Sequence, residues 1–498
     1  MNSKTSHNST SDLGFEGLLN RYEPVIGLEV HCQLKTESKL FCACKTNFGA
    51  LANQNTCPVC LGLPGVLPVL NHQAVDYAIA MALAVGAVIR EKSVFARKQY
   101  FYPDLPKGYQ ITQYDLPYCE AGRLRLDTGK EIVIQRIHME EDAGKSIHGD
   151  NASYVDLNRA GIPLLEIVSA PELSGPQEAY DYLKKLRAIA RYLDISDGNL
   201  EEGSFRCDAN VSLRPRGSQA FGVRTEIKNL NSFKNVERAI TYEIFRQADI
   251  LESGGLVKQV TLLFDAASGR TQVMRSKEDS PDYRYVPDPD LGLLYLSQER
   301  VAQVKSRIPE LPEGKSLRFQ TEFGLTEADA RQLTEEKELA AYFEALVAAV
   351  QGKVTAKIVA NWILSEYLRE HNTRHWTCGQ QDLSVEAFAE LLGLLGDGTI
   401  SGKIAKSVFE EMVESGARAP AIIHSKGLVQ ITDKDEIKAM VQRVLEAYPE
   451  QIEQYRSGKH KVFGFLVGQV LKASQGRYNP GLVNDCLKEA LHEPAKKD

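Results

Sequence analysis

Four segments of the chain place carboxylate, imidazole and basic side chains at alternate positions, which is the spacing of one face of a β-strand. The segments are residues 25–34, 132–142, 205–214 and 223–229. Their polar faces carry Glu29, His31 and Gln33; Arg136, His138, Glu140 and Asp142; Arg206, Asp208, Asn210, Ser212 and Arg214; and Arg224, Glu226 and Lys228. Carboxylates can bind a divalent cation while arginine and lysine neutralise phosphates, so these faces together predict a nucleotide and metal site.

A simpler interpretation is that each segment is a strand of an antiparallel sheet with one solvated face. For any single strand this interpretation is the better one, but ordinary solvated faces favour threonine, lysine and tyrosine. We therefore expect magnesium to bind through Glu29, Glu140 and Glu141. His31 is the fourth candidate ligand; because magnesium prefers oxygen, its alternative role is to orient a carboxylate or to contact the nucleotide.

Residues 144–146 read Gly-Lys-Ser, the ending of a nucleotide-binding P-loop. A P-loop also needs a glycine five positions before this Gly144, and Met139 stands there. The tripeptide is therefore interpreted as incidental, and the neighbouring carboxylates as the functional groups. Lys145 is kept as a candidate phosphate contact.

Four cysteines form two close pairs, Cys42 with Cys44 and Cys57 with Cys60, separated by a loop of twelve residues. Two such pairs can present four thiolates tetrahedrally to zinc, and a closed site of this kind is structural. The alternative is a set of separately buried thiols, and zinc is the favoured interpretation. The remaining cysteines are expected to be packing residues: Cys32, Cys119, Cys207, Cys378 and Cys486.

Aromatic and basic residues are mixed in the segment 97–117, which includes Lys98 and Tyr100. Such a mixture suits stacking on a base or on a nucleotide ring. A proline-rich loop anchored by buried aromatic side chains explains the segment equally well.

A second basic stretch lies near the C-terminus, where no acidic residue occurs between Gln454 and Asn484. Its bases are Arg456, Lys459, Lys461, Lys472 and Arg477. In a chain with a net charge of -7, such an island predicts contact with a phosphate backbone, while a solvated helix face is the equal alternative.

The composition is that of an ordinary globular protein, with 498 residues, 43% of them hydrophobic and 25% charged. The acidic balance argues against indiscriminate coating of nucleic acid, and no apolar run approaches the length of a membrane helix, so no membrane contact is expected. The opening segment has no apolar signal core. Nine cysteines without a secretory signal indicate a reducing compartment, and we expect the cytosol.

Hydrophobic periodicity predicts an α+β chain with a strand-rich body and an all-helical second half. Within the body, helices are expected at 72–86 and 176–193. Capping signals predict a helix from Thr326 towards Val350, a helix over 401–416, and helix starts at Thr432 and at Asn479-Pro480. The expected order is a disordered tail over 1–20, the body over 21–298 with the cysteine knuckle at 42–60, a helical domain over 299–415, and a compact module over 416–498.

Several long motifs resemble the B-subunit family of aspartyl/glutamyl-tRNA amidotransferases. They include IGLEVHCQL, YFYPDLPKGYQITQ, HMEEDAGKS, NRAGIPLLEIVSAPE, LEEGSFRCDANVSLR, TEIKNLNSF, SPDYRYVPDPDL and GFLVGQVLKAS. The resemblance runs in order from about Tyr22 to the C-terminus. It implies a cradle domain related to the glutamine synthetase fold, a helical domain, and a tail similar to the YqeY proteins.

The resemblance also implies an activity. Proteins of this family use ATP to convert the side-chain carboxylate of misacylated Glu-tRNA(Gln) or Asp-tRNA(Asn) into an acyl phosphate. A glutaminase partner, the A subunit, releases ammonia from glutamine, and this ammonia displaces the phosphate. A third protein, the C subunit, fastens the other two together. The expected enzyme is a ligase that forms carbon–nitrogen bonds with glutamine as amido donor.

By motif, the resemblance places the ATP and magnesium site at Glu29, His31, Glu140 and Glu141. The resemblance also places Asp208, Glu226 and Lys228 along the same cavity, and we assign substrate or phosphate contacts to these three residues. We expect Lys98, Tyr100, Arg206 and Lys145 to contact the nucleotide. In the tail, the tRNA-binding residues are expected to be Lys459, Lys461, Lys472 and Arg477. Zinc occurs in only some members of the family, so here it is expected from the four cysteines of this chain.

Two other function classes fit parts of the pattern. A zinc-stabilised RNA-binding protein would leave the carboxylate faces as plain solvated sheet and would not respond to ATP with magnesium. A metal-dependent phosphohydrolase would release phosphate from ATP without any tRNA. The chain has no serine cluster of the amidase type, so it is not expected to hydrolyse glutamine alone.

Overall fold

The computed structural model describes residues 14–276, 283–374, 383–428, 433–474 and 478–492. The chain forms two compact units, which meet in sequence between Pro312 and Glu313. Among the described residues, no helix is long and apolar enough to cross a membrane.

The first unit is built on a nine-stranded sheet in which only one neighbouring pair, β12 with β13, is parallel. In sheet order the strands are β14 (Arg270–Ser276), β13 (Val260–Asp265), β12 (Thr225–Leu230), β11 (Phe205–Pro215), β1 (Tyr22–Gln33), β10 (Pro163–Ser169), β7 (Glu131–Glu141), β6 (Cys119–Arg125) and β2 (Val88–Ile89). This sheet supplies the four strands that the alternating segments predict.

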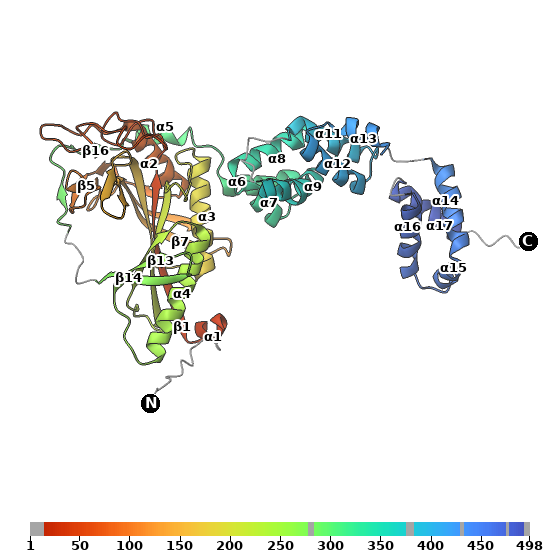
Figure 1. The fold of residues 1–498 in the computed structure, drawn as a ribbon, viewed down its shortest axis with the longest axis horizontal. Coiled ribbons are helices and arrows are strands. Elements are labelled where there is room, and N and C mark those ends of the chain that lie inside the picture. Colours follow the sequence, from red (N-terminus) through yellow and green to blue (C-terminus); the bar gives the residue numbers. More distant parts are fainter. Residues whose placement is uncertain (1–13, 277–282, 375–382, 429–432, 475–477, 493–498) are drawn as a thin grey trace, which may run out of the picture. The chain divides into compact units, whose positions relative to one another are not determined.

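Helices cover one face of this sheet, as α3 and α4 show in Figure 1. The helices of this unit are α1 (Phe15–Leu19), α2 (His72–Ala84), α3 (Pro176–Tyr192), α4 (Phe233–Glu252) and α5 (Gln298–Lys305). The apolar face of β1, with Ile26, Leu28 and Val30, forms one core with Leu186 of α3 and Ile240 of α4. Because alternate side chains of a strand point to opposite faces, this core turns the polar residues to the other face of the sheet.

Three small sheets complete the first unit. They are β15 (Val286–Pro287), β4 (Ala96–Gln99) and β5 (Tyr109–Thr112); β16 (Leu294–Tyr295) with β3 (Lys92–Ser93); and β8 (Lys145–His148) with β9 (Ser153–Asp156). The sheet of β15, β4 and β5 carries part of the aromatic segment 97–117 and is called the small sheet below.

Both ends of the first unit differ from the expected boundaries. Helix α1 forms within the stretch expected to be disordered, and Leu18 is buried in the core; residues 1–13 lie outside the described part of the chain. Helix α5 belongs to the first unit, because the Arg300 guanidinium donates to Asp76 of α2 at 2.8 Å. The unit therefore runs on to Pro312 and does not end at residue 298.

The second unit is helical. Its elements are α6 (Pro312–Phe323), α7 (Glu327–Thr334), α8 (Lys337–Ala349), α9 (Ala356–Trp362), the π-helical turn η3 (Ile363–Tyr367), α10 (Leu368–Arg374), α11 (Val385–Gly396), α12 (Gly402–Ser415), α13 (Ala419–Lys426), α14 (Lys434–Ala447), α15 (Pro449–Arg456), α16 (Lys461–Ala473) and α17 (Pro480–His492). Helices α14, α16 and α17 share a hydrophobic core of their own. This core lies within the stretch expected to form a compact module, while residues 313–498 as a whole make up one unit.

The capping signals agree with some of the helix ends and miss others. Thr326 caps α7 by accepting from the Asp329 amide, but this helix ends at Thr334 and a second helix follows, so the single expected helix is two. Helix α12 ends as expected, with Gly416 at a φ of 69°, in the left-handed region that glycine favours. Helix α14 is capped by Asp433, one residue after the expected start at Thr432, which lies outside the described residues.

Replacement of Leu186 by alanine is expected to destabilise the first unit by about 2–5 kcal/mol, because it leaves a cavity in the core between α3 and the sheet. Leu186 is fully buried, whereas Leu263 of β13 is 42% exposed and provides a matched leucine. Urea unfolding followed by circular dichroism measures the change. Equal losses for Leu186→Ala and Leu263→Ala would contradict the position of this core.

Candidate active site

Strand β1 assembles the polar face because it lies between β10 and β11. Its register sets Glu29 opposite Asp208 of β11, and it sets His31 opposite Glu166 of β10. On the next strand, His138 of β7 stands opposite Glu166. The predicted polar faces are therefore neighbours in one sheet and form a single surface.

This surface forms the floor of a cavity of about 410 Å³. The small sheet and residues beside it add a wall, with Lys98, Thr112, Gln113, Tyr114, Tyr283 and Tyr285. The floor is lined by Glu29, His31, Arg136, His138, Glu140, Glu166, Asp208, Asn210, Arg224, Glu226, Lys228, Gln259, Val260 and Thr261. The cavity therefore combines carboxylates, histidines, bases and aromatic rings.

One cluster in this cavity joins two histidines to two carboxylates. The Nε2 atom of His138 lies 3.2 Å from Glu166 Oε2 and 3.7 Å from Glu140 Oε2. The Nε2 atom of His31 lies 3.6 Å from Glu166 Oε2 and 3.9 Å from Glu140 Oε1. Candidate ligand atoms of His31, Glu140 and Glu166 lie within 4.8 Å of one another, so these three can hold a metal ion.

Electrostatics couples the four groups of this cluster. Burial by itself lowers the pKa of His138, but the negative charge of Glu166 and hydrogen bonds to both carboxylates raise that pKa to about 9. His31 also has a raised pKa, because its contacts with Glu166 outweigh the effect of burial. Burial would raise the pKa of Glu166, yet the two histidines hold it well below its ordinary value.

A second cluster, of three carboxylates, lies beside the first. Candidate oxygens of Glu29, Asp208 and Glu226 lie within 4.8 Å of one another. The Lys228 ammonium lies 2.5 Å from Asp208 Oδ2 and 2.8 Å from Glu226 Oε1, and Asn210 donates to Glu29 Oε1 at 2.9 Å. Burial and the charges of Glu166 and Asp208 raise the pKa of Glu29. A divalent cation bound through these oxygens would compensate the excess negative charge.

The single expected metal site is thus divided. Glu29 groups with Asp208 and Glu226, whereas His31 and Glu140 group with Glu166. Glu141 joins neither cluster, because it follows Glu140 on a strand and its side chain points to the other face. There it is paired with Lys107 and accepts from the Ile111 amide at 2.9 Å. Glu141, one of the four expected magnesium ligands, therefore lies outside both clusters.

Of the four residues expected to contact the nucleotide, only Lys98 lines the cavity. Arg206 instead donates to Asp142 Oδ2 at 2.9 Å. Tyr100 does not line the cavity, although its ring centroid lies 5.9 Å from that of Tyr283, which does. Lys145 is exposed at the start of the hairpin formed by β8 and β9, so the Gly-Lys-Ser tripeptide forms no phosphate loop.

Glu166 is the main residue that sequence reasoning did not select. It is the only acid in the strand PLLEIVS, and a single carboxylate among apolar residues is the signal that would have found it. The wall residues Thr112, Gln113, Tyr283 and Tyr285 carry no such signal, because they reach the cavity from loops and from a separate sheet.

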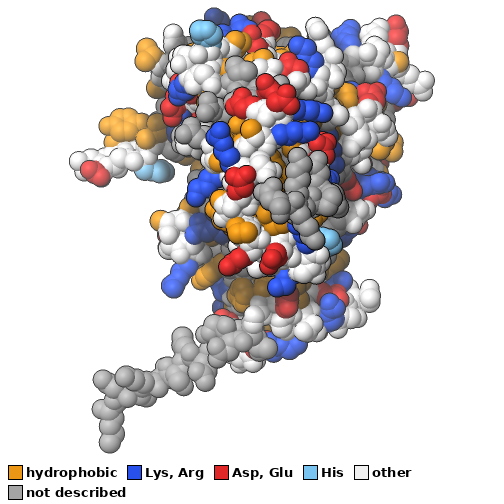
Figure 2. Space-filling model, turned by 90° about the vertical axis from the view of Figure 1, so that its right-hand side faces the viewer, with side chains coloured by type: hydrophobic (Ala, Val, Ile, Leu, Met, Phe, Trp, Pro, Cys, Tyr) orange, Lys and Arg blue, Asp and Glu red, His pale blue; other side chains and the backbone are white. Residues whose placement is uncertain are grey.

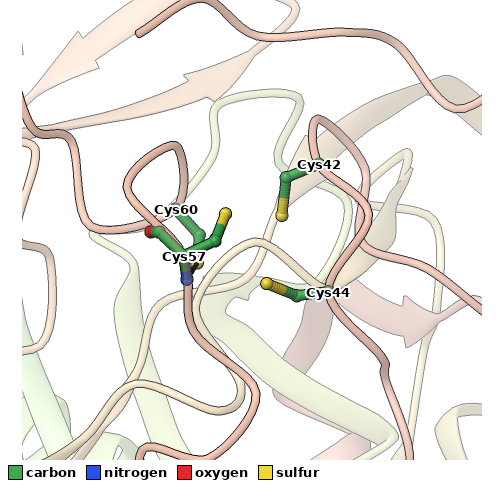
Figure 3. Close-up of side chains that lie close together, drawn as sticks. All are labelled: Cys42, Cys44, Cys57 and Cys60. Atoms are coloured by element: carbon green, nitrogen blue, oxygen red, sulfur yellow. Dashed lines mark hydrogen bonds between the residues drawn. The ribbon is translucent and has the colours of Figure 1, made fainter.

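The cysteine knuckle is formed as expected. Cys42 and Cys44 come from one loop and Cys57 and Cys60 from another, and their side chains face a common space in Figure 3. The four sulfur atoms lie within 4.8 Å of one another, which suits one metal ion held by four thiolates. Cys32, Cys119, Cys207 and Cys486 are buried as packing residues, and Cys378 lies outside the described residues.

Comparison with known proteins identifies the family of this chain. The model of the GatB/GatE catalytic domain matches residues 24–302, and the model of the GatB domain matches residues 341–491. The chain is 54% identical to the B subunit of the aspartyl/glutamyl-tRNA(Asn/Gln) amidotransferase of Solidesulfovibrio magneticus, over 95% of this chain and 99% of the relative. The chain belongs to this family of amidotransferase B subunits. Relatives from a Geobacter species (54% identical, 95% and 99% covered) and Moorella thermoacetica (53%, 94% and 100%) have the same name.

In this member of the B-subunit family, the expected tRNA contacts lie around α16. Lys461 begins the helix, Lys472 lies in its last turn, and Lys459 precedes it; all three are exposed or partly exposed. Arg477 lies outside the described residues. Basic and acidic side chains are interspersed among the described residues that Figure 2 draws.

In the magnesium-free protein, the free energy of unfolding is expected to fall as the pH rises from about 6.5 to about 9. Protonated His138 stabilises the fold through Glu166, and this contribution is complete below the ordinary histidine pKa and lost above the raised one. Replacement by glutamine, His138→Gln, should reduce stability at about pH 6 more than at about pH 10. Denaturant unfolding across this range measures the difference.

The matched control is His148→Gln, because His148 is an exposed histidine of β8 whose ring nitrogen lies 2.9 Å from Ser153 Oγ. It is expected to leave the pH dependence of stability unchanged. A His138→Gln variant with the same pH dependence as the wild type would contradict the His138–Glu166 interaction.

Proposed function

We propose that this chain is the carboxylate-activating component of a glutamine-dependent tRNA amidotransferase. In this proposal it uses ATP to phosphorylate the side-chain carboxylate of misacylated Glu-tRNA(Gln), Asp-tRNA(Asn) or both. Ammonia then displaces the phosphate to give Gln-tRNA(Gln) or Asn-tRNA(Asn). The overall reaction is that of a ligase that forms carbon–nitrogen bonds with glutamine as amido donor.

One observation carries this proposal: the carboxylate clusters and the bases share one cavity, within the residues that the catalytic-domain model matches. A carboxylate is a poor electrophile, whereas an acyl phosphate reacts with ammonia at neutral pH. Its formation requires an incoming carboxylate in line with the γ-phosphate and positive charge around that phosphate. The cavity has bases for the phosphate and carboxylates for a metal, which supports phosphoryl transfer over simple RNA binding.

The bases of the cavity have distinct positions for this reaction. Within the described ranges Lys98 forms no ion pair with a carboxylate, so its ammonium is available to a phosphate oxygen. Lys228 is held between Asp208 and Glu226 and can orient those carboxylates. Arg136 and Arg224 line the floor and can hold further phosphate or carboxylate oxygens.

We assign magnesium to the two clusters, with Glu29, Asp208 and Glu226 in one, and His31, Glu140 and Glu166 in the other. When bound, magnesium supplies charge neutralisation for the phosphate groups of ATP. The floor carboxylates already contact Lys228, Asn210 and the histidines. These contacts disfavour the floor carboxylates as acceptors of the phosphoryl group.

The remaining parts are proposed from the family. Ammonia comes from the glutaminase partner (the A subunit) through a path that keeps it unprotonated, and the C subunit joins that partner to this chain. Zinc is assigned to the cysteine knuckle, and the tRNA body to Lys459, Lys461 and Lys472. We further propose that the cradle is related to the glutamine synthetase fold, that the tail is YqeY-like, and that the enzyme works in the cytosol.

The test is ATP-dependent phosphate release by the chain reconstituted with both partner proteins, with and without misacylated Glu-tRNA. We expect release that requires the charged tRNA. Glu29→Gln and Glu140→Gln should each lower it by at least about 100-fold, because each removes a metal ligand worth several kcal/mol in the transition state. Circular dichroism confirms that the variants fold.

Glu131→Gln is the matched control, since Glu131 is an exposed carboxylate at the start of the same strand as Glu140. It should leave phosphate release unchanged. Release without tRNA would instead indicate a phosphohydrolase, and absence of release with tRNA still bound would indicate a scaffold that only holds tRNA.

A further inference from the structure

The small sheet is fastened to β7 by side chains. Glu141 is the anchor: its Oε1 accepts from the Ile111 amide at 2.9 Å and pairs with Lys107, while its carbonyl accepts from Gln110 Nε2 at 2.7 Å. Glu141 and Lys107 are both largely shielded from solvent, with side chains 3% and 10% exposed. A pair shielded in this way is screened less than a surface ion pair, so it can hold two elements in register.

The contacts between the small sheet and β7 continue at the preceding residue, Glu140, which lines the cavity. Thr112 donates to Glu140 Oε2 at 3.1 Å, and the Met139 amide donates to Gln113 Oε1 at 3.0 Å. Since the small sheet also carries Lys98 on β4, its attachment determines where the Lys98 ammonium stands relative to Glu140. The Glu141–Lys107 pair thus positions two sides of the cavity without lining it.

The other side of this pair touches the cysteine knuckle. Gly62 follows Cys60 by two residues, and its φ of 67° lies in the left-handed region. A Cβ placed on Gly62 would lie 2.5 Å from Lys107 Cγ, so the knuckle backbone packs directly on the Lys107 stem. Movement of this loop would therefore release the lysine.

A buried lysine supports the charge of the knuckle. Lys39 is fully buried, and its ammonium donates to the Asn55 carbonyl at 2.8 Å, to the Leu157 carbonyl at 3.2 Å and to Cys60 Sγ at 3.6 Å. An ammonium buried among neutral groups is costly. Four thiolates around one zinc ion have a net charge of -2, which would compensate Lys39.

We propose that the cysteine knuckle, with its metal bound, positions the catalytic cavity through Lys107 and Glu141, and that Lys39 stabilises the metal-bound knuckle. The knuckle holds Lys107, Lys107 holds Glu141, and Glu141 holds the small sheet over Glu140. Glu141 and Lys107 are positioning residues. The inference deepens the proposed function and rests on it for the activity measurements only.

The first test measures zinc binding by the full chain with a competing chelating dye. Lys39→Met is expected to weaken zinc binding by at least about 10-fold, as expected for loss of an outer partner of a ligand. Lys45→Met is the matched control, because Lys45 is an exposed lysine of the same knuckle, and it should leave zinc affinity unchanged. Equal affinity in wild type and Lys39→Met would overturn the role of Lys39.

The second test follows hydrogen exchange in the full chain and does not depend on activity. Removal of zinc is expected to speed exchange of the Ile111 amide, the donor to Glu141, and Lys107→Met should speed it with zinc still bound. The Gln33 amide, which donates to the Ser204 carbonyl at 2.8 Å, should keep its protection in both cases. Unchanged exchange at Ile111 in both samples would overturn the proposal.

The third test compares zinc removal, Lys107→Met, and the two changes combined. The measured quantity is the kcat of tRNA-dependent phosphate release by the reconstituted complex. We expect each change alone to lower kcat about 10-fold and both together to cause little further loss, because they break one chain of contacts. If the combined loss of kcat equals the product of the two single losses, the two changes act independently, and the proposed coupling is overturned. If zinc removal unfolds the chain, zinc-loaded Lys107→Met decides: normal kcat overturns the proposal.

Failure of the proposed function is distinguishable from failure of this inference. A zinc-loaded wild type without phosphate release would refute the activity, while the dye and exchange measurements would still decide whether the knuckle orders the small sheet.

Discussion

Repulsion between carboxylates on one sheet face is the constraint on which the arrangement of the cavity depends. The register of β1 with β10 and β11 brings Glu29, Asp208 and Glu166 into one low-dielectric region, where each charge raises the cost of the next. Cations supplied by other strands relieve this cost: His138 from β7 and Lys228 from β12. The site is therefore a balance of charges, in which a bound divalent cation would relieve the remaining repulsion between carboxylates.

The opposite face makes this balance possible. Helices α3 and α4 bury the apolar side chains of the same strands in a continuous core, so the backbone that carries the charges is held rigidly. A rigid sheet allows like charges to remain close together without moving apart. The stability of the apolar layer thus maintains the unfavourable electrostatics of the polar layer.

The two faces of β7 place adjacent carboxylates in different surroundings. Glu140 enters the cavity, while Glu141 pairs with Lys107 beside the cysteine knuckle. The alternation of a strand, a purely local property, makes one carboxylate a candidate ligand and the next an anchor for the small sheet. The motif HMEED therefore combines two different roles in adjacent residues.

The sequence predicts four strands with their polar faces, several helix ends and the cysteine pairs. These features depend on local rules, namely two-residue alternation, helix caps at Thr326 and Gly416, and the spacing of thiols. It also identified Glu29, His31, Glu140, Asp208, Glu226 and Lys228, which do line one cavity. The folded arrangement was needed to group Glu166 with them, to divide the carboxylates into two clusters, and to place Glu141, Arg206, Tyr100 and Lys145 outside the cavity lining. Strand order, register and the attachment of the small sheet arise from contacts between residues far apart in the chain, which no local pattern encodes.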